Sequence, residues 1–178
     1  MIGVLVSGEG TNLQALIDAG LPIAAVASNR AGARALERAA EAHIPARVFA
    51  AADYPDRDAR DRELAEWLLL RGVDLVVLAG YMHLLTQSFL ERFPDRIVNV
   101  HPSLLPDFPG ARAVEDALSA GVETTGVTVH YVDEGLDTGE VIRQEEVRVE
   151  PRETLVERIH AVEHRLLPEV VSQLCLVR

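Results

Sequence analysis

The stretch Ile2-Gly3-Val4-Leu5-Val6-Ser7-Gly8-Glu9-Gly10-Thr11-Asn12 decides the fold class, because it leads from an apolar strand through a glycine loop into a helix start. Similar apolar runs, typical of strands buried on both faces of a parallel sheet, recur at 23–27, 46–49, 75–78 and 97–100. Segments with helical periodicity lie between or beside them, at 12–18, 33–42, 60–70 and 86–92. This alternation predicts βαβ units, and hence an α/β, Rossmann-like fold with a mostly parallel sheet and helices on both faces.

The pattern changes after residue 112. A helix is predicted over 113–120, two strands over 124–131 and 141–149, and a long final helix over 154–174. Pro168 lies inside that helix, where we expect a kink or a break. There are no repeats, low-complexity tracts or linkers, so we expect one domain with a mixed sheet over residues 1–178.

Composition excludes several classes of protein. The net charge is −11 in 178 residues, which disfavours binding along a nucleic-acid backbone. All seventeen basic residues are arginine, so neither a P-loop lysine nor a lysine Schiff base is available. One cysteine rules out an internal disulfide, and no apolar run is long enough to cross a membrane. Without a signal-peptide pattern at the N-terminus, we expect a cytoplasmic location.

The segment Asn99-Val100-His101-Pro102 carries the clearest chemistry. Because side chains alternate along a strand, Asn99 and His101 should project from the same side, just where Pro102 ends the ladder. An amide and an imidazole at one point can stabilise an oxyanion, and the imidazole can also transfer a proton. Taken alone, the motif favours an asparagine that satisfies loop backbone and a histidine that caps a strand, and only the rest of the chain favours catalysis.

Two more loops should lie at the same edge of the sheet, where α/β proteins bind ligands: the loop that begins at Ser7, and residues 79–83. The glycines and the Thr11-Asn12 pair at a helix N-terminus suit a monophosphate, since N–H groups and the helix dipole favour an anion there. The alternative is an N-cap at Thr11 or Asn12, which uses the same donors. Leu13 stands where a dinucleotide fingerprint needs its third glycine.

The loop Asp133-Glu134-Gly135-Leu136-Asp137-Thr138-Gly139 is strongly acidic. It reads either as a solvated turn or as a source of a carboxylate for His101, with Asp137 the candidate because the glycine beyond it allows a close approach. It lacks the ligand spacing of an EF-hand. His160 and His164 have a spacing that can bind zinc, but no third ligand is evident, and we expect no metal.

These motifs together resemble the folate-dependent glycinamide ribonucleotide formyltransferase family of purine synthesis, over nearly the whole chain. The matching motifs are Ser7-Gly8-x-Gly10-Thr11-Asn12-Leu13-Gln14, Ser28-Asn29, Val77-Leu78-Ala79-Gly80-Tyr81-Met82, Asn99-x-His101-Pro102-Ser103-Leu104-Leu105-Pro106, Gly126-x-Thr128-Val129-His130, Leu136-Asp137-x-Gly139 and Glu163-His164. The Asn-x-His-Pro and Leu-Asp-x-Gly pieces are shared with other formyl-folate enzymes.

The resemblance implies formyl transfer from 10-formyltetrahydrofolate, a co-substrate, to the amine of glycinamide ribonucleotide. It implies a catalytic trio of Asn99, His101 and Asp137, with Thr128 holding an ordered water or the catalytic loop. The implied ribonucleotide-binding residues are Gly10, Thr11, Asn12, Asn99, His160 and Glu163. The implied folate-binding residues are Arg57, Met82, His83, Leu84, Leu85, Asp133, Glu134, Gly135, Leu136 and Asp137. The domain would then divide into a nucleotide-binding half, 1–100, and folate and catalytic loops within 80–140.

One departure from the family pattern is His83, where many members carry an arginine that would meet the anionic tail of folate. The nearest alternative is a formyltetrahydrofolate hydrolase, which uses a similar trio with water as acceptor. A methionyl-tRNA formyltransferase is disfavoured by the acidic charge and by the lack of a further C-terminal domain, and a non-catalytic binding module by the complete trio. The expected partners are the two small-molecule substrates, with no nucleic acid or membrane, and the sequence leaves a homodimer open.

Overall fold

The structure, a computed structural model, describes residues 1–176 and consists of two compact units, Met1–Val98 and the part that begins at Asn99. In the first unit the strands are β1 (Ile2–Val6), β2 (Ile23–Ser28), β3 (Ala46–Val48) and β4 (Leu75–Leu78). Its helices are α1 (Thr11–Asp18), α2 (Ala35–Glu41), α3 (Arg57–Leu69) and the single turn α4 (Gln87–Leu90). Strand β5 (Ile97–His101) begins in the first unit and ends in the second.

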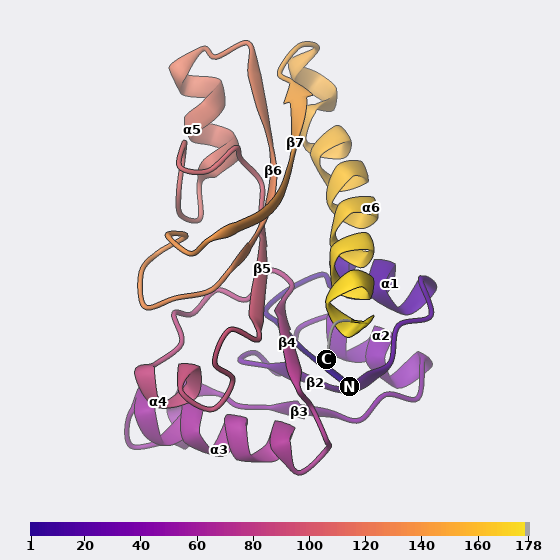
Figure 1. The fold of residues 1–178 in the computed structure, drawn as a ribbon, viewed down its shortest axis with the longest axis vertical. Coiled ribbons are helices and arrows are strands. Elements are labelled where there is room, and N and C mark those ends of the chain that lie inside the picture. Colours follow the sequence, from indigo (N-terminus) through magenta and orange to yellow (C-terminus); the bar gives the residue numbers. More distant parts are fainter. Residues whose placement is uncertain (177–178) are drawn as a thin grey trace. The chain divides into compact units, whose positions relative to one another are not determined.

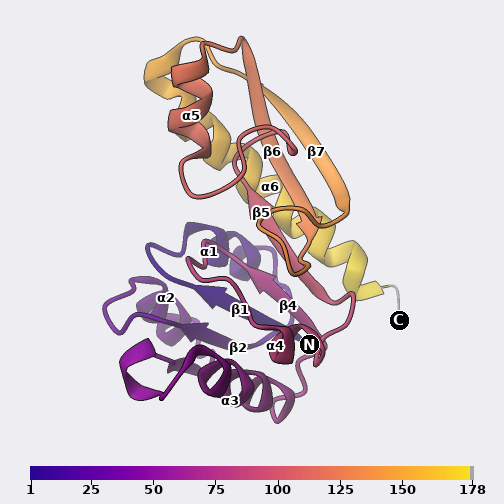
Figure 2. The same ribbon diagram turned by 90° about the vertical axis from the view of Figure 1, so that its left-hand side faces the viewer.

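The first unit is a parallel sheet with the strand order β3-β2-β1-β4. Every residue of β1 and β4 is buried, as continuous apolar runs predict for strands covered on both faces. Helices α1 and α3 lie on opposite sides of these strands (Figure 2). The loops after β1 and β4 therefore open at the same, carboxyl, edge of the sheet.

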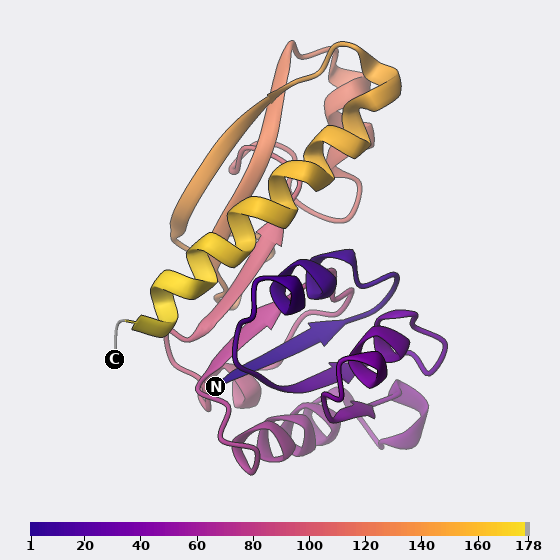
Figure 3. The same ribbon diagram turned by 90° about the vertical axis from the view of Figure 1, so that its right-hand side faces the viewer.

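The second unit contains α5 (Ala113–Ala120), an antiparallel hairpin of β6 (Thr124–Tyr131) and β7 (Val141–Arg148), and α6 (Leu155–Leu176). Helix α6 lies along this hairpin (Figure 3). The predicted α/β class with a mostly parallel, mixed sheet is confirmed, and β1, β4, α5 and β6 have their predicted bounds.

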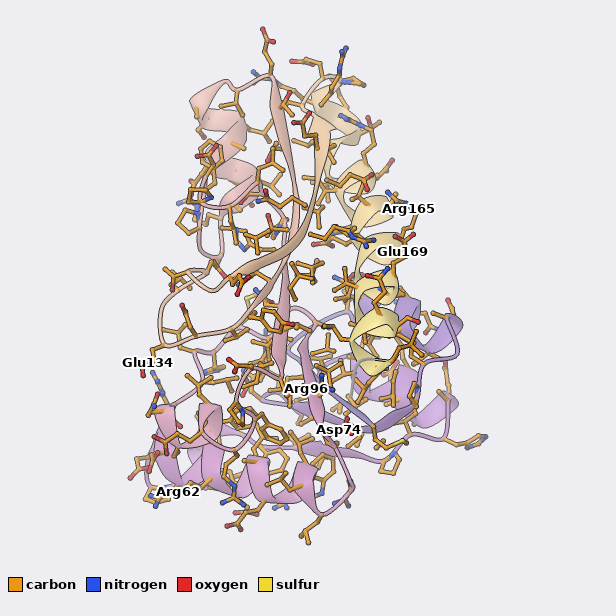
Figure 4. The ribbon with its side chains drawn as sticks, in the orientation of Figure 1. Arg62, Asp74, Arg96, Glu134, Arg165 and Glu169 are labelled. Carbon is orange, nitrogen blue, oxygen red and sulfur yellow. The ribbon has the colours of Figure 1, made fainter. Side chains whose placement is uncertain are left out.

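Helix α6 is attached to β7 by charged pairs as well as by apolar packing. Arg165 binds Glu145 of β7, and the hydrogen bond with that carboxylate raises the pKa of Arg165. Arg143 of β7 lies 3.2 Å from Glu169, which follows Arg165 by one turn on the same face of α6 (Figure 4). These exposed pairs contribute little stability each but fix the pairing of helix and strand.

Two predictions about helices are corrected. Helix α6 continues through Pro168, so the expected break is wrong. Its flanking residues Leu166, Leu167, Val170 and Val171 are all buried, and this packing offsets the lost backbone hydrogen bond. The helix predicted over 86–92 is reduced to the turn α4. Among the described residues, no helix is long and apolar enough to span a membrane.

Candidate active site

The carboxylate of Asp137 is at the centre of a buried polar cluster in the second unit. Its Oδ2 lies 3.4 Å from Nδ1 of His101 and accepts a 2.8 Å hydrogen bond from the N–H of Gly110. Its Oδ1 accepts a 3.4 Å hydrogen bond from Nδ2 of Asn99. The structure therefore brings together the three residues predicted at the end of β5 and in the acidic loop. The alternative of a purely solvated turn is wrong for Asp137, whose side chain is only 10% exposed.

The loop between β6 and β7 brings Asp137 to this position through two backbone features. Asp137 itself has a φ of +55°, a left-handed conformation that aspartate tolerates better than most residues. Two residues on, a Cβ on Gly139 would lie 1.8 Å from the carbonyl oxygen of Tyr131, so only glycine allows the chain to pass there. The sharp, close turn expected from the glycine is confirmed.

His101 has an acceptor at each ring nitrogen. Nε2 lies 2.9 Å from the carbonyl oxygen of Phe108, and Nδ1 faces the Asp137 carboxylate. The hydroxyl of Ser103 donates to the carbonyls of Asp107 and Phe108, which holds the Phe108 carbonyl in place. An imidazolium, which has two N–H groups, satisfies both acceptors at once. The imidazole thus faces a carboxylate on one side and a carbonyl on the other, in a site where His101 is only 5% exposed.

His130 is a member of the cluster to which the sequence assigned no role. Its Nδ1 lies 2.7 Å from its neighbour's carbonyl, that of Tyr131, and its Nε2 lies 3.2 Å from Nδ2 of Asn99. Burial lowers the pKa of His130, so the neutral ring donates from Nδ1 and accepts from Asn99 at Nε2. This fixes the Asn99 amide. The sequence did contain a signal for His130. Thr128 and His130 are polar residues two positions apart, which is the spacing of side chains on one face of a strand.

Thr128 holds the loop that follows β5. Its hydroxyl donates to the carbonyl of Ser103 and accepts from the N–H of Leu105, at 2.7 and 3.1 Å. Gln144, its partner across the hairpin, donates to the same hydroxyl and to the Leu105 carbonyl. Of the two roles that the resemblance allowed, these contacts favour holding the catalytic loop.

In the first unit, the loop after β1 meets helix α1 at Gly10. Gly10 is the N-cap, with a φ of +71°, and no side chain caps the helix, so the alternative of Thr11 or Asn12 as the N-cap is wrong. A Cβ on Gly10 would lie 2.5 Å from that of Ala35 on α2. The N–H groups of the first turn of α1 are thus not consumed by a cap, as an anion site requires.

The residues after β4 are held by the end of β1. The hydroxyl of Ser7 accepts a hydrogen bond from the N–H of Met82 and donates to Oδ1 of Asn29, which follows β2. Met82 and Leu84 have 65% and 48% of their surface exposed, so their side chains are not what fixes this segment. At His83, burial and the nearby Arg60 lower the pKa, so the imidazole is neutral at pH 7.

On α6, Glu163 is buried whereas His160 is exposed, and the His160 and His164 rings stack with their centroids 5.9 Å apart. Arg57 is the first residue of α3, where Asp56 caps the helix. Asp133 accepts hydrogen bonds from Gly135 and Thr138 and shapes the loop that carries Asp137. Within residues 1–176, no group of three or more histidine, cysteine, aspartate or glutamate side chains is arranged to hold a metal ion.

Comparison with known proteins identifies the class. A family model described as formyl transferase matches residues 1–171, and the chain belongs to this family. The phosphoribosylglycinamide formyltransferase of Bacillus subtilis is 40% identical over 182 residues, covering 96% of this chain and 92% of that protein. Within the formyl transferases, the chain therefore belongs with the phosphoribosylglycinamide formyltransferases.

A solved structure agrees. The glycinamide ribonucleotide transformylase 1 of Geobacillus kaustophilus is 48% identical, with a TM-score of 0.94 and 97% of each chain covered. The chain is also 46% identical to part of a trifunctional purine biosynthetic protein, adenosine-3, of Drosophila pseudoobscura pseudoobscura. It spans about one seventh of that protein, 14% of its length.

Proposed function

We propose that this chain transfers the formyl group of 10-formyltetrahydrofolate to the amine of glycinamide ribonucleotide, a step of purine biosynthesis. The observation that carries the proposal is the Asp137 carboxylate, 3.4 Å from both His101 Nδ1 and Asn99 Nδ2 in a buried site. Membership of the phosphoribosylglycinamide formyltransferases supplies the substrates, and the trio supplies groups suited to acyl transfer between two nitrogens.

The reaction exchanges one carbon–nitrogen bond for another. The neutral amine attacks the formyl carbon, and the carbonyl oxygen becomes an oxyanion that the Asn99 amide and protonated His101 stabilise by hydrogen bonds and charge. Collapse of this intermediate breaks the bond to the folate nitrogen. The attacking amine loses one proton and the departing nitrogen gains one, with Asp137 relaying the proton through water. Formyl is never attached to the enzyme, and no metal takes part.

We assign the remaining residues to the two substrates as follows. The phosphate of the ribonucleotide binds Gly10, Thr11 and Asn12 at the start of α1, and the ribose binds Glu163, with His160 nearby. Folate binds Arg57, the segment Met82, His83, Leu84, Leu85 and the loop Asp133, Glu134, Gly135, Leu136, Asp137. Support comes from the uncapped helix start and from the backbone anchoring of residue 82.

The test is consumption of 10-formyltetrahydrofolate with and without glycinamide ribonucleotide. We expect turnover only when both are present, with formylglycinamide ribonucleotide and tetrahydrofolate formed in equal amounts. Equal turnover without the ribonucleotide would make the chain a hydrolase, and calorimetric binding of both ligands without turnover would make it a binding module. We place the reaction in the cytoplasm, with small molecules as the only substrates, since the net charge of −11 opposes nucleic-acid binding.

A further inference from the structure

Helix α3 contains a buried ion pair that has no part in the proposed reaction mechanism. Arg60 and Asp61 are 1% and 0% exposed, and Nε and Nη2 of Arg60 donate to the same Asp61 oxygen, at 2.9 and 2.7 Å. Neighbours in a helix project about 100° apart and do not normally face each other. Their pairing therefore requires side-chain conformations that the helix does not itself favour.

Stability does not account for this pair. A buried ion pair loses so much hydration that an apolar replacement is often neutral or stabilising. Nη1 of Arg60 and the hydroxyl of Tyr81 are also buried with no hydrogen-bond partner among the described residues, which costs further free energy. Burial raises the pKa of Tyr81 to about 12, so its hydroxyl remains protonated. The pair therefore costs folding free energy. The contact made by the second carboxylate oxygen of Asp61 indicates what the pair does.

Oδ2 of Asp61 accepts a 2.9 Å hydrogen bond from the N–H of Thr86. One turn earlier on α3, Asp58 accepts a hydrogen bond from Ser88, which in turn contacts the Thr86 hydroxyl at 3.0 Å. Helix α3 thus holds the chain where α4 begins. At the other end, Ser7 holds the N–H of Met82. Residues 82–86 are fixed at both ends by main-chain N–H groups.

We propose that the Arg60–Asp61 pair is a positioning device that sets the main chain of residues 82–86 for the folate co-substrate. This inference rests on the proposed function, which assigns residues 82–85 to folate. The main chain of this segment is anchored at both ends, so we place recognition in its N–H and C=O groups. Asp61 sets that direction through Thr86, and Arg60 compensates the charge of Asp61.

The same pair also acts electrostatically on the histidine at position 83. Arg60 lies within electrostatic range of His83 and Tyr81 and, together with burial and Arg57, lowers the pKa of His83. Asp61 acts in the opposite direction and raises the pKa of His83.

The experiment compares two substitutions at one residue. Thr86→Pro removes the N–H group that donates to Asp61. The φ of Thr86 is −80°, a value that proline adopts. Thr86→Val keeps the N–H and removes the hydroxyl that contacts Ser88, so it separates the main-chain contact with Asp61 from the side-chain contact. A second pair compares the neutral double variant Arg60→Met/Asp61→Asn with Arg62→Met, at an exposed position of the same helix (Figure 4).

Folate binding is measured directly by calorimetry, alongside kcat, both KM values and the urea midpoint. We expect Thr86→Pro and the double variant to weaken folate binding about tenfold or more, since small displacements of binding groups have large effects. The ribonucleotide KM and the urea midpoint should remain close to those of Thr86→Val and Arg62→Met. Equal folate affinity in all four variants would overturn this inference alone. Failure of the wild-type chain to bind folate would overturn the proposed function as well.

Discussion

Replacing Asp137 with asparagine is the sharpest test of the catalytic cluster, because the side chain keeps its shape and loses only its charge. In the structure one carboxylate contacts three groups that can donate to it, His101, Gly110 and Asn99, and the unprotonated Nε2 of His130 lies 3.7 Å away. An amide oxygen can still accept from Gly110, so the loop should stay closed. The amide NH₂ would then face the Asn99 NH₂, and no anion would remain beside a protonated His101.

We expect kcat of Asp137→Asn to fall by about two to four orders of magnitude, the range for loss of a general acid–base group. That loss corresponds to about 3–5 kcal/mol of transition-state stabilisation. KM for both substrates should change by less than about tenfold, because the lost interaction belongs mainly to the transition state. The assay is steady-state turnover of formyl-folate with the ribonucleotide, supported by calorimetric titration of each ligand.

The control for this substitution is Asp107→Asn, which removes one negative charge from an exposed position in the neighbouring loop. It should leave kcat nearly unchanged. If Asp137→Asn retained kcat to within about threefold of Asp107→Asn, the carboxylate would be a structural contact of the loop, and the reasoning from the cluster would fail.

Three further outcomes follow from the structure. Joint replacement of Thr11 and Asn12 by alanine should raise the ribonucleotide KM and leave folate affinity nearly intact, as calorimetry with each ligand alone would show. Gly139→Ala should lower both the urea midpoint and kcat, because the new Cβ would lie 1.8 Å from the Tyr131 carbonyl oxygen and must displace the Asp137 loop. The control is Gly32→Ala, where a Cβ would meet no atom within 4 Å. Burial lowers the pKa of His130 from its ordinary value of 6.5. As the pH falls, the unfolded chain therefore binds a proton at His130 before the folded chain does. The free energy of unfolding should keep its full His130 contribution above pH 6.5 and decrease from there toward the lower pKa of the folded state. Urea unfolding across that range should show a shallower pH dependence in His130→Asn than in the wild type, and an equal dependence in both would contradict the prediction.

The proximity of Asn99, His101 and Asp137 was predictable because its signals are local. Strand alternation places Asn99 and His101 on one side of β5, and a glycine two residues after Asp137 permits a sharp turn. Apolar runs located the strands well for the same reason: complete burial leaves a continuous pattern. The α6 break failed because packing along a long amphipathic helix outweighs one missing backbone hydrogen bond at Pro168.

Positions set by tertiary contacts were not predictable. Asp61 looks like any charged residue of an exposed helix face, and its burial depends on a bond to a main-chain N–H that is 25 residues away. Arg60 follows the same pattern, since only its partner makes a buried guanidinium acceptable. Neither residue type nor position within α3 distinguishes the buried Arg60 and Asp61 from another Arg–Asp pair of the same helix, Arg62 and Asp58, in which Arg62 remains exposed.

The contact between Phe108 and His101 shows why the sequence alone could not describe the surroundings of the His101 imidazole. A backbone carbonyl has no side-chain signature, and this one is aimed at the imidazole by a left-handed φ of +51° at Phe108 and by the hydroxyl of Ser103. Such a conformation is uncommon for a bulky residue and is stable only where neighbouring contacts enforce it. Because His101 Nε2 already donates to this carbonyl, a formyl oxygen must share or replace that acceptor as its negative charge develops. We therefore propose that the loop that holds Phe108 takes part in the chemistry, and that Thr128, which holds the same loop at Ser103 and Leu105, acts as a positioning residue.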